Sequence, residues 1–186
     1  MHKKFIFMEI AGCLFTAVGC IFMRNLYTLS NYGLSGVLFG SVNSSPWEYA
    51  KTLFLPYLAW SMLELLCLGK GLHRLAVVKA SSMCLLLGLY LSLSTVLNGK
   101  NSELLIASVS VLAAQIFSYI LSKSHLNLES LFPAALCTLF LLLAFYFSFT
   151  PFPPKNQLFA DKISGQYGIP PIGYDFGADA LFTIIK

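Results

Sequence analysis

The stretch LAVVKASSMCLLLGLYLSLSTVL, residues 75–97, decides the kind of fold that this chain can adopt. It contains one charged residue, Lys79, within an otherwise apolar run. An α-helix needs about 20 apolar residues to cross the hydrocarbon core of a bilayer, and this stretch meets that length. The stretch therefore predicts a transmembrane helix.

The composition of the whole chain agrees with a membrane environment. The 186 residues are 57% hydrophobic and 11% charged, whereas soluble domains carry about 25% charged residues. The mean hydropathy is +0.74. The net charge of +4 is dispersed, without a basic tract of the kind that follows phosphates, so nucleic-acid binding is not expected.

Four other segments are long and apolar enough to span a bilayer. They are residues 5–23, 49–68, 103–122 and 128–149. The first resembles a signal peptide, but its length and its Glu favour a retained helix. Residues 33–40, GLSGVLFG, are too short to cross and suggest an interfacial or re-entrant segment. We therefore predict an all-α, polytopic membrane bundle of about five transmembrane helices.

The last part of the chain differs from the rest. Residues 151–186 hold five of the eight prolines and four of the thirteen glycines, which excludes a spanning helix. They also hold apolar and aromatic residues that disordered tails usually lack. We predict two parts, a helix bundle over residues 1–150 and a Pro/Gly-rich tail over 151–186 that packs on the outer face.

The distribution of positive charge predicts the orientation. With a cytoplasmic N-terminus, six basic residues fall on the inner side: Lys3, Lys4, Lys70, Arg74, Lys79 and Lys123. Three fall on the outer side: Arg24, Lys51 and Lys100. Five spans then place the tail outside the cell membrane.

The start of the second span carries a cluster of polar residues, in the stretch SVNSSPWEYAK, residues 41–51. Ser45 to Glu48 fit a capping box with Pro46 at the first helical position. Trp47 suits the interfacial aromatic belt, and Lys51 lies three residues after Glu48, at a spacing that permits pairing. These features are sufficient for a purely structural role.

A functional alternative for the same stretch stays open. Asn43, Glu48, Tyr49 and Lys51 would then line an outward-facing cavity that binds a small molecule or a lipid headgroup. Charged residues at a helix mouth can serve either purpose.

A second ionic group is predicted near the opposite, inner face. Glu9, Glu64 and Lys79 fall at similar depth on the first, second and third spans. Charges inside spans are costly and usually pair within the bundle, so we predict a Glu64–Lys79 pair with Glu9 as a second acceptor. Its role is either a staple between helices, with Lys79 reaching toward the headgroups, or a proton or ion relay.

No motif for a metal, a cofactor or a hydrolase triad is present. The three histidines are not spaced as ligands, and G-x-S-x-G, P-loop and G-x-G-x-x-G sequences are absent. The five cysteines lie in apolar runs without a C-x-x-C pair, which favours buried small hydrophobic residues. We expect neither cofactor nor metal.

The chain resembles a family of small, functionally uncharacterised bacterial integral membrane proteins. That family carries a Glu in its first helix, N-E-S-x-W-E-H-L-K at the start of its second, and a tail like F-P-P-x-x-P-L-F-x-D-P-x-x-G-x-Y-G-I. The matching stretches here are MEIAG, VNSSPWEYAK and FPPKNQLFADKISGQYGI. Tyr49 replaces the family's His, and no His occurs near residues 24–27, which puts any chemistry of those histidines in doubt.

The resemblance and the predicted orientation place both motifs on one face. Asp161 and Tyr167 of the tail would then cover Glu48 and Lys51, and Asp161 would cap a helix, pair with Lys51 or Arg24, or bind a cationic ligand. Three hypotheses remain: a binding or transport protein, a membrane enzyme acting on a lipid-linked substrate, and a structural subunit of a membrane complex.

Overall fold

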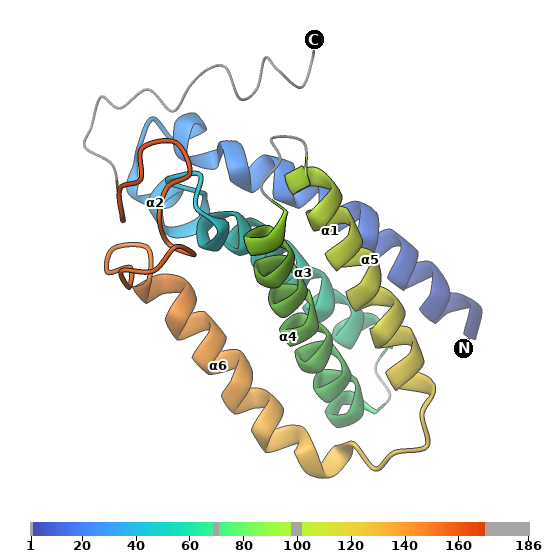
Figure 1. The fold of residues 1–186 in the computed structure, drawn as a ribbon. Coiled ribbons are helices and arrows are strands. Elements are labelled where there is room, and N and C mark those ends of the chain that lie inside the picture. The colour runs from blue at the N-terminus through green and yellow to red at the C-terminus, as the bar shows by residue number, and fades with distance from the viewer. Residues whose placement is uncertain (1, 69–70, 98–101, 170–186) are drawn as a thin grey trace.

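The protein is a bundle of helices, as the computed structural model in Figure 1 shows; the structure describes residues 2–68, 71–97 and 102–169. The helices are α1 (His2–Leu29), α2 (Leu34–Phe39), α3 (Pro46–Leu68), α4 (Leu72–Val96), α5 (Ser102–Lys123), the 3-10 turn η1 (Glu129–Leu131) and α6 (Phe132–Ser148). Five of these segments are long and apolar enough to span a membrane, so the predicted all-α membrane fold is confirmed.

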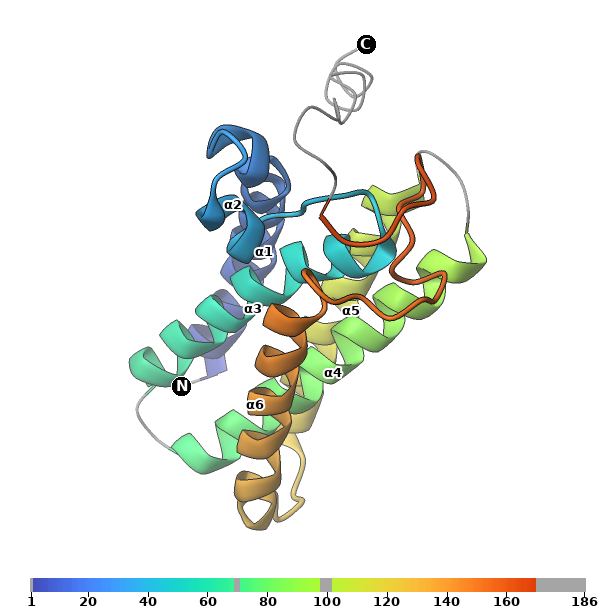
Figure 2. The ribbon, with the colours of Figure 1, turned by 90° about the vertical axis from the view of Figure 1, so that its left-hand side faces the viewer.

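Helices α1, α3, α4 and α5 form a closed four-helix arrangement. α4 packs against α3 and α5, and α1 packs against the same two helices from the other side. α6 lies outside this group and packs on α4, so it forms the left-hand edge of the molecule in Figure 1 and faces the viewer in Figure 2. Within the most apolar window of each helix, 61% of the residues of α4 are buried but only 11% of those of α6.

The outward faces of the bundle are apolar, as a lipid environment requires. Large exposed hydrophobic side chains include Phe7, Leu14, Val18, Phe140 and Leu141. The prediction that the cysteines are buried is correct for Cys20 but wrong for Cys67, Cys84 and Cys137, which are exposed. A small apolar side chain can face lipid as readily as the protein interior, so the sequence pattern does not separate the two positions.

The chain reverses direction at two ends of the bundle. One end, called the tail end below, holds the C-terminal ends of α1, α4 and α6, the N-terminal ends of α3 and α5, and residues 150–169 of the tail. The rest of the predicted tail, residues 170–186, lies outside the described residues. The segment predicted to be interfacial or re-entrant forms the short helix α2, which lies beside the last turns of α1. α1 itself extends six residues beyond the predicted end at 23, to Leu29.

Glycines allow α1 to approach its neighbours closely. A Cβ atom on Gly12 would lie 2.5 Å from Gln115 Nε2 of α5 and 2.5 Å from Trp60 Nε1 of α3. A Cβ atom on Gly19 would lie 2.6 Å from Cβ of Pro56 in α3. Small residues at such crossings permit the tight helix packing that stabilises membrane bundles.

We therefore expect Gly12→Leu to destabilise the bundle by about 2–3 kcal/mol, because overpacking forces α1 away from α3 and α5. The measurement is the thermal unfolding midpoint of the purified protein in detergent. Gly88→Leu is the matched control, because a Cβ atom on this helical glycine meets nothing within 4 Å. Equal unfolding midpoints for the two variants would contradict the close approach of α1.

Candidate functional site

The polar stretch before α3 forms a cap in which side chains and the tail accept several backbone N–H groups. Ser45 Oγ accepts the backbone N–H of Glu48 at 3.2 Å, as the capping box predicts. The reciprocal bond differs from the prediction. The Asn43 side-chain oxygen accepts the N–H of Ser45 at 2.9 Å, and Glu48 Oε2 accepts the N–H of Val42 at 3.2 Å.

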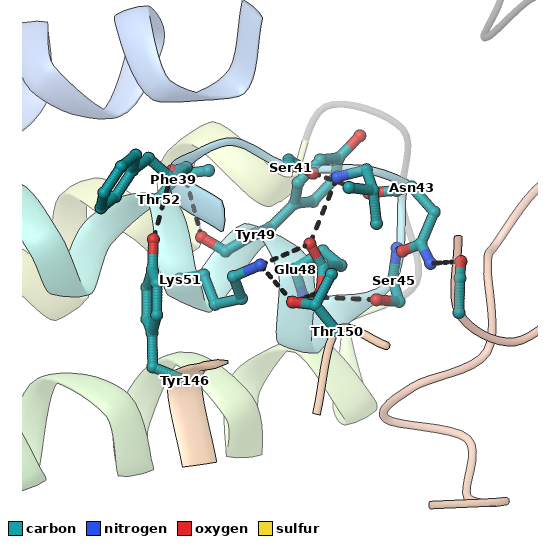
Figure 3. A network of polar contacts seen from close by, with 12 residues as sticks. Phe39, Ser41, Asn43, Ser45, Glu48, Tyr49, Lys51, Thr52, Tyr146 and Thr150 are labelled. Atoms are coloured by element: carbon teal, nitrogen blue, oxygen red, sulfur yellow. Dashed lines mark hydrogen bonds and ion pairs between the residues drawn. The ribbon is translucent and has the colours of Figure 1, made fainter. Parts of the chain in front are cut away.

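Glu48, Lys51 and Thr150 form a buried polar network at the tail end (Figure 3). Lys51 Nζ lies 3.0 Å from Glu48 Oε2 and also donates to the Thr150 hydroxyl. The Thr150 hydroxyl donates to Glu48 Oε1 at 2.9 Å. All three residues are 2% exposed, so the predicted Glu48–Lys51 pair exists and is closed off from solvent.

Asp161 holds the tail against the start of α3. Its Oδ1 atom accepts from the backbone N–H of Ser44 at 3.0 Å and from the Ser44 hydroxyl. Its Oδ2 atom accepts from the backbone N–H of Ser164 at 3.0 Å and from that hydroxyl at 2.5 Å. Burial raises the pKa of this carboxyl, but the hydrogen bonds from Ser164 and Ser44 outweigh that effect and leave the pKa below its usual value. Asp161 thus contacts the residue before the N-cap Ser45, and no ion pair between Asp161 and Lys51 or Arg24 occurs among the described side chains.

Two further bonds join the tail to the same stretch. The Asn43 side-chain amide donates to the Gly168 carbonyl at 3.0 Å. The backbone N–H of Trp47 donates to the Leu158 carbonyl at 3.0 Å. The tail therefore satisfies donors at the N-terminus of α3 that would otherwise lack a partner in the helix.

Aromatic rings cover the polar network. The ring of Trp47 lies 5.3 Å from that of Phe149 and 5.3 Å from that of Phe159, measured between centroids, and the latter two are also 5.3 Å apart. Trp47 Nε1 is buried and has no hydrogen-bond partner. Trp47 thus packs against the tail instead of serving only as an anchor in the headgroup region.

A narrow crevice separates the tail from the start of α3, and it has no room for a water-sized molecule. Its lining residues come from α3, the cap before it, the end of α6 and the tail: Asn43, Ser45, Trp47, Glu48, Phe149, Thr150, Pro153, Phe159 and Gly168. A ligand can reach the carboxylate of Glu48 only after the tail has moved.

The second ionic group lies toward the opposite end of the bundle. Lys79 Nζ lies 2.9 Å from Glu9 Oε1 and in ion-pair contact with Glu64 Oε2, as predicted. Ser118 donates to Glu9 Oε1 at 2.7 Å, and the Gln115 side-chain oxygen lies 3.5 Å from Lys79 Nζ. Lys79 is 3% exposed and Glu64 is fully buried, so Lys79 does not extend toward the headgroups.

An apolar core separates the two polar groups. Glu48 and Glu64 are both on α3, about 24 Å apart at the helical rise of ~1.5 Å per residue. The large buried side chains between them include Leu53, Phe54, Tyr57, Met83, Leu86 and Tyr90. The predicted relay would have to continue through this layer, and the buried side chains that fill it are mainly apolar or aromatic.

The predicted ligand-binding residues do not all meet at the crevice. Asn43, Trp47 and Glu48 line it, and Asp161 anchors its cover. Tyr167 instead forms an isolated bridge with Ala160 and is 43% exposed. Tyr49, which the cavity hypothesis includes, also lies elsewhere, because its ring packs 4.2 Å from the Arg24 guanidinium carbon.

Sequence reasoning missed several residues that form hydrogen bonds with Glu48, Asp161 and Glu9. Thr150 directly follows Phe149, the last residue of the last predicted span. This position at the end of a span is the one sequence feature that could have pointed to its contact with Glu48. Ser44 is one of several polar residues within residues 41–51 and cannot be singled out by type. Ser118 is one of many hydroxyl residues in the spans, and nothing in the pattern connects it with Glu9.

Comparisons with known proteins give a family but no activity. No match was found among curated proteins, and none among solved structures. A family model described as "Family of unknown function (DUF6512)" matches residues 1–169, the whole bundle and the described part of the tail. The chain belongs to this family of unknown function.

Proposed function

We propose that this protein binds a small zwitterionic ligand at the tail end, with the tail as a movable cover. The observation that carries the proposal is a buried pair of opposite charges, Glu48 and Lys51, directly under a segment held mainly by hydrogen bonds. A zwitterion carries one positive group, which would face Glu48, and one negative group, which would face Lys51. Ion pairs in membrane proteins that contact no lipid or water are commonly part of a ligand or ion site.

The surroundings favour an amine as the positive group. Trp47, Phe149 and Phe159 present aromatic faces to the crevice, and an ammonium is attracted to such faces as well as to a carboxylate. The unpartnered indole N–H of Trp47 offers one hydrogen bond to an anionic group. Phosphoethanolamine combines both features, whether free or as the headgroup of a lipid.

The orientation proposed with this function places the tail end outside the cell, following the distribution of positive charge. Five crossings, one for each candidate span, would leave the N-terminus of α1 and the tail on opposite sides of the membrane, which supports this orientation. The ligand would then come from the outer leaflet or from the space beyond it.

The experiment uses the fluorescence of Trp47 in the full chain, in a Trp60→Phe background that leaves one tryptophan. We expect soluble phosphoethanolamine to produce a saturable change, since the ligand would displace the packing of Trp47 against Phe159. Vesicles with and without phosphatidylethanolamine distinguish a lipid source from a soluble one.

The variants separate binding from general damage to the fold. Glu48→Gln removes one charge of the pair and is expected to weaken binding at least tenfold, while Glu129→Gln, at an exposed carboxylate of η1 at the other end of the bundle, leaves it unchanged. Absence of a saturable response in both the single-tryptophan protein and its tail-released form, Asp161→Ala, would contradict the proposal.

A further inference from the structure

The buried triad of Glu9, Glu64 and Lys79 is not balanced in charge. Two carboxylates contact one ammonium, so the fully ionised triad carries a net charge of −1. Among the described side chains, no second Lys or Arg lies in ion-pair contact with either carboxylate. An unpaired charge in a dry, membrane-embedded site is costly enough that the group takes up a proton or a counter-ion instead.

The hydrogen bonds around the triad show the same deficit. Glu9 Oε2 and Glu64 Oε1 are buried without a hydrogen-bond donor, while Glu64 Oε2 faces the ammonium of Lys79. The amide nitrogen of Gln115, whose oxygen faces Lys79, is a buried donor that reaches neither carboxylate. Anionic oxygens in a buried site are normally surrounded by donors, so these oxygens suit a carboxyl that carries its own hydrogen.

The described side chains of the neighbouring elements that contact the triad add no further charge to this balance. α1 contributes Cys13 near Glu9, and α3 contributes Tyr57, both neutral in their ordinary states. The residues of α5 in contact with the triad are the neutral Ser118 and Gln115. The ring of Tyr57 lies 5.9 Å from Lys79 Nζ, which stabilises the ammonium without adding a charge.

We propose that the Glu9–Lys79–Glu64 triad is a binding site for a single proton. A proton from the aqueous phase adds to one carboxylate oxygen, so that one O–H bond forms there and one O–H bond of a hydronium ion breaks. The triad is then neutral and holds one carboxylic acid, one carboxylate and one ammonium. The acid hydrogen gives an otherwise unsatisfied oxygen pair a donor. This site is independent of the proposed ligand site, from which the apolar core separates it.

The test counts protonated carboxyl groups by infrared spectroscopy of the full chain in sodium-free lipid membranes at neutral pH. Buried carboxylic acids give a carbonyl band that is resolved from carboxylates and shifts in heavy water. We expect one such group in the wild type. Glu9→Gln and Glu64→Gln should each reduce the count to none, because Lys79 then neutralises the single remaining carboxylate.

In Lys79→Met the count is expected to rise to two protonated carboxyl groups, because the ammonium that neutralises one carboxylate of the triad is then missing. Glu103→Gln, on the exposed ion pair with Lys162, should leave the count at one and serves as the matched control. Circular dichroism serves as the control that each variant keeps a near-native helical spectrum. If a variant fails to fold, the count of protonated carboxyl groups in the wild type alone tests the proposal.

Two results would overturn the proposal. The first is a wild type without a protonated buried carboxyl in any buffer. The second is a band that disappears when sodium chloride replaces choline chloride at constant pH, which would make the triad a cation site instead. A band that survives in Glu9→Gln or Glu64→Gln would assign the proton to another carboxyl and would also overturn it.

Discussion

Replacing Lys79 with Met is expected to destabilise the protein by roughly 3–5 kcal/mol, the range measured when one partner of a buried ion pair is removed. Lys79 is the only described cation in ion-pair contact with Glu9 and Glu64, and both carboxylates are buried. Without it, two carboxyl groups must either remain charged in a dry site or both take up protons. Total stabilities are commonly about 5–15 kcal/mol, so a loss of this size endangers the fold.

The measurement is the thermal unfolding midpoint and the yield of folded protein in detergent. Lys162→Met is the control, because its ion pair with Glu103 involves side chains that are 31% and 20% exposed, and such pairs contribute about 0–1 kcal/mol. The triple variant Lys79→Met, Glu9→Gln, Glu64→Gln should recover much of the loss, since no charge is then left unpaired. A Lys79→Met protein as stable as the wild type would contradict a structural role for the triad.

The triad of Glu9, Glu64 and Lys79 shows how much of such a fold can be predicted from its sequence. Apolar length alone predicts the five spans, because the bilayer imposes it on every membrane helix. The depth of Glu9, Glu64 and Lys79 follows from counting residues along those spans, and so does their meeting in the bundle. Charges at matching depth in a membrane have few alternatives to pairing, which is why this contact could be predicted.

The contacts at the tail end were predicted less completely. The Ser45 cap and the Glu48–Lys51 pair depend on spacing within one helix, and both are present. The contact of Asp161 with Ser44 joins residues 117 positions apart, and no local rule fixes it. Nor does local sequence separate Tyr167, which is exposed, from Phe159, which is buried, because both are aromatic residues of one irregular segment.

The hypotheses about function differ in how they depend on these contacts. An enzyme that uses Glu48 as an acid or base, a binding protein and a structural subunit all require the tail to sit on α3 in the resting state. Only the first two require it to move. Both Glu48 oxygens already have donors in Lys51, Thr150 and Val42, so any external group must displace an internal one. The strength of tail docking is therefore the quantity that separates the hypotheses.

Asp161→Ala is expected to release the tail, because it removes the two hydrogen bonds that join this buried carboxylate to Ser44 before α3, and also the two that shape the tail itself at Ser164. Hydrogen bonds to a charged group contribute about 1.5–3 kcal/mol each and do not add fully, so a loss on the order of 3 kcal/mol in docking free energy is expected. The measurements are amide hydrogen exchange over residues 158–168 and trypsin cleavage after Lys162, both of which should increase at least tenfold. Ile163→Ala, on the same segment and 70% exposed, is the matched control.

The pH dependence of tail docking gives an independent check on the same carboxylate. Its pKa in the docked tail lies below the ordinary value of 3.8, so protonation favours the undocked state. The contribution of Asp161 is therefore complete above that ordinary value and is lost as the pH falls through the lower, docked pKa. Exchange over residues 158–168 in the wild type, corrected for its intrinsic pH dependence, should rise only in this acidic window, and the rise should be absent in Asp161→Ala. If the variant kept both the wild-type protection and the acid-induced rise, Asp161 would not be the group that holds the cover in place.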